Sequence, residues 1–135
     1  MNNVIKLYCQ TASLAELRKF LQEKLEESAI SDALQLQLIL AVEEVCANLI
    51  IHSHHCNQSE HISVQVSQSE SRIIFEIRDQ GDSFNLLEYD TPKIKQVVGE
   101  KRKGGIGIIL VKKIMDEIKF SAVGKTNICQ LIKKI

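Results

Sequence analysis

The sequence has no net charge, because its 17 basic and 17 acidic side chains cancel. A neutral chain creates no overall field that would gather nucleic acid or an anionic membrane surface. We therefore expect no direct nucleic-acid partner and no membrane partner. Any anionic ligand must be held by local groups.

Long hydrophobic runs are also missing. The first residues lack the apolar segment of a secretory signal, and no stretch approaches the roughly 20 apolar residues that cross a bilayer. The four cysteines are scattered and form no CxxC pair, which favours reduced thiols over a disulfide framework. These absences predict a cytoplasmic protein.

Proline is nearly absent, and its position is informative. The only proline, Pro92, lies between Gly81 and Lys103, where the hydrophobic periodicity of the chain fails. We expect a loop with the character of a lid at about 85–103. With 135 residues, 44% of them hydrophobic, and no internal repeat, residues 1–135 are expected to form a single domain.

The remaining sequence is strongly periodic. Apolar residues at helical spacing predict a first helix over 14–28, capped by Thr11 or Ser13, and a second helix capped by Asp32. A third helix is expected to begin at Gly104–Gly107, with an apolar stripe that includes Met115 and Ile118. Strands are predicted from alternation at 4–9, 62–66, 73–77, 120–123 and 128–132.

This order of elements predicts an α+β fold. We expect a two-layer sandwich, in which three helices cover one face of a mainly antiparallel, mixed sheet. The period of two places Asp79 on the same face as Ile73, Phe75 and Ile77. The carboxylate of Asp79 is therefore expected to point toward the helices.

Two polar residues interrupt the apolar stripe of the second helix. Glu44 and Asn48 are four positions apart and share one face of the helix. An amide oxygen of Asn48 suits Mg²⁺, which usually completes its shell with water and substrate phosphates. Glu44 can orient or deprotonate a nucleophile. The alternative is that Glu43, Glu44 and Asn48 only line a solvated helix edge.

The segment Gly104-Gly105-Ile106-Gly107 precedes a helix, whose positive N-terminal end attracts phosphate. Lys103 and the two basic residues before it add positive charge. A phosphate-binding turn is the functional interpretation, and glycines that ease entry into a helix are the structural one.

The segment Asp79-Gln80-Gly81 also allows two interpretations. It is either a binding motif or a strand end followed by a turn.

Other nucleotide-binding motifs are absent. Gly124-Lys125-Thr126 matches the end of a P-loop, but Lys119 stands where its first glycine belongs. Leu110 stands at the third glycine position of a dinucleotide fingerprint. A cluster of His52, His54, His55, Cys56 and His61 fits no known closed zinc site, and a polar helix end is the alternative to metal binding.

Three segments in order resemble the histidine-kinase-like ATPase superfamily: residues 40–52 around Glu44 and Asn48, residues 79–84 with Asp79, Gly81 and Phe84, and residues 104–111. Nearly the whole chain is similar in particular to the anti-sigma-factor serine kinases. The resemblance implies that Asn48 holds Mg²⁺ and Glu44 is the general base. It implies that Asp79 accepts a hydrogen bond from the adenine amino group, supported by Thr126, and that Gly81 admits the base.

The same resemblance implies that Gly104, Gly105, Ile106 and Gly107 surround the phosphates of ATP beneath the lid. It further implies an enzyme that phosphorylates a serine of a small antagonist protein, sequesters a sigma factor and is usually a dimer. The alternative function is a binding module that holds the nucleotide without turnover and acts by masking a sigma factor or another regulator.

Overall fold

The computed structural model describes residues 3–53, 57–80 and 105–135. Along the chain these residues form β1 (Val4–Tyr8), α1 (Ser13–Leu25), α2 (Asp32–Asn48), the short π-helix η1 (Leu49–Ser53), β2 (His61–Gln68), β3 (Arg72–Gln80), α4 (Gly105–Ile114), β4 (Glu117–Val123) and β5 (Thr126–Lys134). The predicted order of strands and helices is confirmed.

The strands form one sheet in the order β1-β2-β3-β5-β4. Each pairing between described strands is antiparallel, so the expectation of a mixed sheet is wrong. The crossover through α4 does make β4 run in the same direction as β3. These two strands are not neighbours, however, because β5 folds back between them through the hairpin turn at Gly124, whose φ is 62°.

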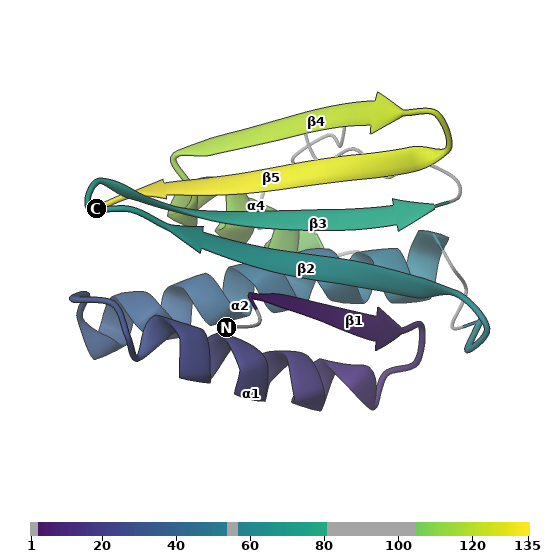
Figure 1. Cartoon of the computed structure of the whole chain (residues 1–135), viewed down its shortest axis with the longest axis horizontal. Helices are drawn as coiled ribbons and strands as arrows, with labels where there is room; N and C mark the ends of the chain where they lie inside the picture. Colours follow the sequence, from purple (N-terminus) through teal and green to yellow (C-terminus); the bar gives the residue numbers. More distant parts are fainter. Residues whose placement is uncertain (1–2, 54–56, 81–104) are drawn as a thin grey trace.

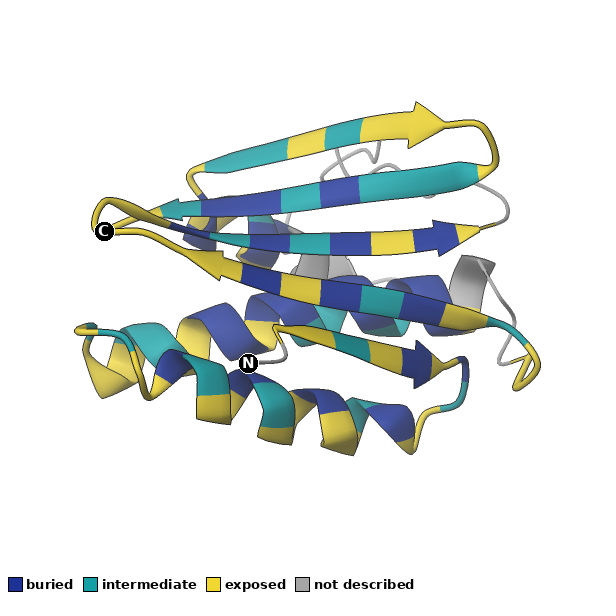
Figure 2. Cartoon of the chain, viewed as in Figure 1, coloured by how far each residue is buried: buried dark blue, intermediate teal, exposed yellow. Residues whose placement is uncertain are grey.

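The helices lie on one face of the sheet, which gives the predicted two-layer α+β sandwich (Figure 1). Alternate residues of β2 and β3 are buried, while their neighbours are more exposed (Figure 2). The core contains these strand residues and the apolar stripes of α1 and α2. Each such side chain contributes roughly 1.5–3 kcal/mol through burial.

Helix α2 is strongly apolar. By length and composition, Asp32–Ile51 is sufficient to cross a membrane, with a mean hydropathy of 1.6, contrary to the expectation from the sequence. Half of its most apolar window is buried inside the fold. Packing on the sheet and on α1 therefore accounts for this apolarity.

The predicted helix ends differ from the observed ones. Ala12, and not Thr11 or Ser13, is the N-cap of α1, and its side chain makes no capping bond within the described residues. Helix α2 is capped by Ser31, whose Oγ accepts a hydrogen bond from the Leu34 N–H at 3.1 Å. Asp32 is instead its first residue.

The third predicted helix is also too long. It ends at Ile114, and Ile118 belongs to β4. The Asp116 N–H donates to the Ile132 carbonyl at 2.9 Å, and the Asp116 carboxylate accepts from the Lys134 N–H at 2.6 Å. These bonds draw the chain into the sheet, so the apolar residue at 118 continues a helical spacing only by coincidence.

Contacts at one end of the sheet fix the direction of the helices. Gln68, at the end of β2, donates to the Lys24 carbonyl at 3.0 Å, which places the α1–α2 loop there. Lys133 Nζ donates to the Ile114 carbonyl at 3.0 Å, so α4 ends there too. The C-terminus of α2 and the N-terminus of α4 consequently lie toward the opposite end, where β3 ends.

Candidate nucleotide-binding site

Asn48 is buried at the C-terminus of α2, with 5% of its surface exposed. Its Nδ2 donates to the Glu44 carbonyl at 2.9 Å and to Glu44 Oε1 at 3.3 Å. Because both partners are acceptors, the amide nitrogen must face them, and Oδ1 faces away. With 5% of its surface exposed, Asn48 does not line a solvated helix edge, so that hypothesis is wrong. An amide oxygen is a suitable ligand for a hard cation.

The two neighbouring acids, Glu43 and Glu44, have different surroundings. Arg18 of α1 donates from Nε and Nη2 to the two carboxylate oxygens of Glu43 at 2.6 and 2.8 Å. This bidentate pair raises the pKa of Arg18, first through the hydrogen bond and then through the charge of Glu43. Glu43 is thus engaged in joining α1 to α2, and Glu44 is the acid of the pair that faces Asn48.

Asp79 lies near the end of β3 with 6% of its surface exposed. It faces the helices, as the alternation of the sequence predicts. Burying a carboxylate in an apolar layer is costly unless partners compensate it. Its charge is felt at Cys129, where burial first and Asp79 second raise the thiol pKa to about 12.

The register of β3 and β5 does not place Thr126, the residue expected to support Asp79, directly beside Asp79. Thr126 is paired with Gln80, and Asn127 is paired with Asp79. Paired residues of antiparallel strands share a face, so Asn127 and not Thr126 lies on the face of Asp79. Sequence reasoning missed Asn127, although the alternation backward from Leu131 and Cys129 assigns it to the helix-facing side.

The glycine-rich segment is described only in part. Gly105, Ile106 and Gly107 form the first turn of α4, whose positive end is directed toward the Asp79 end of the sheet. Gly81, Phe84, Lys103 and Gly104 lie outside the described residues, as does the predicted lid at 85–103. Their roles stay predictions.

The histidine cluster is also described only in part. His61 is exposed at the start of β2, and its ring lies edge-on to Tyr8 with centroids 6.2 Å apart. His54, His55 and Cys56 lie outside the described residues. Within the described part of the chain, no three metal-ligating side chains converge, so metal binding by the cluster stays open.

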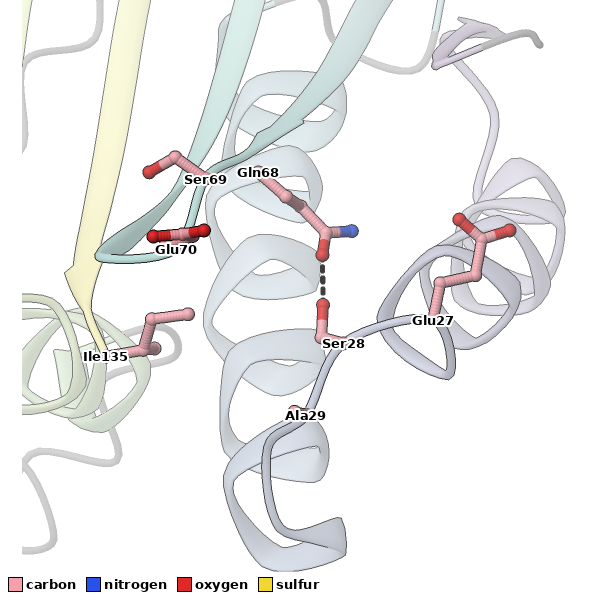
Figure 3. Close-up of a pocket in the computed structure, with 7 residues that line it drawn as sticks. All are labelled: Glu27, Ser28, Ala29, Gln68, Ser69, Glu70 and Ile135. Carbon is pink, nitrogen blue, oxygen red and sulfur yellow. Dashed lines mark hydrogen bonds between the residues drawn. The ribbon is translucent and has the colours of Figure 1, made fainter.

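Cavities lie at both ends of the described sheet. One of about 230 Å³ lies at the Asp79 end and is lined mainly by the outward-facing residues His61, Ser63, Arg78, Gln80 and Thr126, together with Asp79. A larger one of about 410 Å³ lies at the opposite end, between the α1–α2 loop, the β2–β3 turn and Ile135 (Figure 3). The larger cavity contains none of the predicted site residues.

The structure thus gathers a buried amide, a neighbouring acid, a buried aspartate and a glycine-containing helix start at one end of the helix–sheet interface. A sequence model described as the histidine kinase-like ATPase domain matches residues 9–133. The chain belongs to this family. The match covers α2, which holds Glu44 and Asn48, and β3, which holds Asp79.

Curated relatives within the histidine kinase-like ATPase family are similar over part of the chain. The serine-protein kinase RsbW of Bacillus licheniformis is 31% identical over 88 residues, covering 61% of this chain and 54% of the relative. The anti-sigma F factor of Clostridium perfringens is 27% identical, covering 58% of this chain and 56% of the relative. The matched region therefore spans about half the length of these relatives.

Solved structures share the fold. The SiaB–SiaC complex of Pseudomonas aeruginosa contains a chain with a TM-score of 0.65 at 11% identity, covering 98% of this chain and 89% of that one. The RsbU and RsbW domains of a Mycobacterium tuberculosis protein also give 0.65, at 12% identity, covering 98% of this chain and 32% of that one. At these low identities the similarity shows a shared fold and nothing about activity or partners.

Proposed function

We propose that this protein is an anti-sigma regulatory factor that binds Mg-ATP and phosphorylates a serine of an antagonist protein. The observation that carries the proposal is the Glu44–Asn48 pair. The side-chain nitrogen of Asn48 donates hydrogen bonds to Glu44, so the side-chain oxygen of Asn48 faces away from Glu44. The names of the relatives, a serine-protein kinase and an anti-sigma factor, support the two halves of the proposal.

Each site residue has a defined task in this proposal. Asn48 Oδ1 would hold Mg²⁺, whose charge, when bound, offsets that of the ATP phosphates. Glu44 takes the proton from the attacking serine hydroxyl, and its bond to Asn48 keeps the carboxylate next to the metal site. Asp79 accepts from the adenine amino group, while the α4 N-terminus with Gly104, Gly105, Ile106 and Gly107 binds phosphate.

The remaining assignments extend the same proposal. Gly81 and Phe84 would adjoin the adenine and Lys103 the phosphates, beneath a lid at about 85–103 of a single domain spanning 1–135. A sigma factor and the antagonist protein are the proposed partners, and the proposed active form is a cytoplasmic homodimer.

The kinase function is tested by phosphoryl transfer. The purified chain is incubated with Mg²⁺, radiolabelled ATP and the antagonist encoded beside its gene, and Glu44→Gln is compared with the parent. We expect Glu44→Gln to lower transfer by about 10²-fold or more, since general-base catalysis contributes about that much. ADP affinity should stay within about threefold.

Glu43→Gln is the matched control for this experiment, because it changes the adjacent acid, which is bound to Arg18 and does not face Asn48. It should transfer phosphate within about threefold of the parent. Equal activity of Glu44→Gln and the parent would remove Glu44 from the mechanism. Absence of transfer together with ADP binding would favour the alternative, a nucleotide-binding module that masks its regulator without turnover.

A further inference from the structure

The outer face of the sheet, which is turned away from the helices, carries a small polar cavity at the end of β3. Its volume is about 230 Å³, and its lining contains an imidazole, a guanidinium, a carboxamide and two hydroxyls, from His61, Arg78, Gln80, Ser63 and Thr126. Asp79 lines it as well, but the alternation of β3 turns the Asp79 side chain toward the helices. Pockets for drug-sized ligands have roughly 300–1,000 Å³, so this cavity fits a smaller polar group.

The register of the strands places two cations on either side of a hydroxyl in this region. Lys6, Ser63 and Arg78 are paired in one row across β1, β2 and β3. Paired residues share a face of the sheet, and neighbouring strands lie about 4.8 Å apart. The ammonium of Lys6 and the guanidinium of Arg78 therefore flank the Ser63 hydroxyl on the outer face.

Lys6 forms no ion pair with an acid in the described part of the chain. Its Nζ lies 5.3 Å from the centroid of the Tyr8 ring, and this ring is edge-on to His61, which lines the cavity. A cation–π contact holds the ammonium without neutralising it. Lys6 thus supplies a positive charge beside the cavity.

Arg78 is oriented by its neighbour on the same strand. Its Nε and Nη2 lie 3.1 and 3.0 Å from Glu76 Oε2, and Glu76 Oε1 accepts from Gln130 Nε2 at 3.0 Å. Glu76 offsets part of the positive charge, but a guanidinium has five N–H donors in one plane. Since 51% of the Arg78 side chain is exposed, its remaining donors are accessible to a ligand.

We propose that this cavity binds a dianionic phosphate group, with Lys6 and Arg78 as its cations and Ser63 as a donor between them. Arginine and lysine are the side chains that bind phosphate most strongly, and a phosphate group accepts from several donors at once. The phosphate is either the free ion or part of a phosphorylated side chain of another protein. This site is on the face opposite the helices and is independent of the proposed nucleotide function.

Titration of inorganic phosphate into the isotope-labelled full chain, at constant ionic strength, tests the site by NMR. We expect saturable shifts in the amide signals of Lys6 and Ser63, while the signal of Gly105 reports separately on the start of α4. Lys6→Gln and Arg78→Gln should each weaken the outer-face binding about tenfold, as the loss of one charge-assisted hydrogen bond predicts.

Lys119→Gln is the matched control, because it removes a cation of the same face that is paired with Glu117 and lies on β4. It should bind phosphate within about twofold of the parent. Shifts confined to Gly105, shifts that do not saturate, or undiminished binding in both Lys6→Gln and Arg78→Gln overturn the assignment.

A capped phosphoserine peptide and the same peptide without phosphate identify the source of the group. Tighter binding of the phosphopeptide than of inorganic phosphate assigns the site to a phosphorylated side chain, and equal or weaker binding assigns it to the free ion. Equal binding of the two peptides overturns the role of the phosphate. If ADP binding and phosphoryl transfer fail while the outer-face shifts remain, only the proposed function is wrong.

Discussion

At the scale of single residues, two neighbouring glutamates of the site make different contacts. Glu43 and Glu44 are adjacent, yet Glu43 forms the bidentate pair with Arg18 while Glu44 contacts Asn48. The helix sets this difference, because successive residues point about 100° apart. Neither acid could be assigned to its role from its residue type.

The buried thiols provide a prediction about pH. Burial raises the pKa of the Cys46 thiol above its ordinary value of 9.0 and raises that of Cys129 to about 12. The folded protein therefore holds thiol protons that the unfolded chain releases, and stability falls as pH rises from about 9 toward 12. Below about pH 9 this contribution is fully present.

Urea unfolding at pH 8 and pH 10.5 measures the effect. The parent should lose more unfolding free energy between these two pH values than Cys129→Ala does, because the variant lacks one of the titrating groups. The comparison between the two proteins cancels the contributions of lysines and tyrosines. Equal losses in both would contradict the raised pKa of Cys129.

At the scale of elements, short-range contacts at helix ends orient the site. Ser31 begins α2, the helix that ends at Asn48, and Lys133 binds the last carbonyl of α4 while its charge lies near Asp116. A cation at a helix C-terminus is favourable. Both helices are thereby held at the end of the sheet remote from the proposed nucleotide.

Loss of the α2 cap should be measurable. Ser31→Ala removes the acceptor of the Leu34 N–H and should lower the free energy of unfolding by about 1 kcal/mol. Urea denaturation monitored by circular dichroism would show a lower midpoint with an unchanged slope. Ser31→Asp supplies another capping oxygen and should recover most of the loss, and an unchanged midpoint in Ser31→Ala would mean that the cap contributes nothing.

At the scale of the whole molecule, the proposed site joins segments that are far apart in the chain. Asn48, Asp79 and the start of α4 come from three elements, so a ligand that bridges them binds the folded state only. Such a ligand stabilises the fold by mass action. Stability should consequently report nucleotide binding without any enzymatic assay.

Mg-ADP at 100 times its dissociation constant should raise the free energy of unfolding by about 2.7 kcal/mol. Thermal unfolding with ADP, in the presence and absence of Mg²⁺, measures this increase and its metal-dependent part. Asn48→Ala should lose the metal-dependent part, while Asn57→Ala, a change in an exposed turn, should retain it. A metal-dependent shift of full size in Asn48→Ala would rule out Asn48 as the Mg²⁺ ligand.

The sequence by itself determined the order of strands and helices, the inward direction of Asp79 and the shared helical face of Glu44 and Asn48. These features follow from local periodicity, which depends only on neighbours along the chain. The end of α4 could not be placed this way, because the bonds from Asp116 to β5 compete with continuation of the helix.

Only the tertiary structure decided which residue stands beside Asp79. Local alternation assigns Asn127 to the helix-facing side, but its pairing with Asp79 depends on the register between two strands 48 positions apart. A shift of one residue would have put Thr126 there instead, since each step along a strand reverses the face. That register is set jointly by the β4–β5 hairpin and the packing of the whole sheet on its helices.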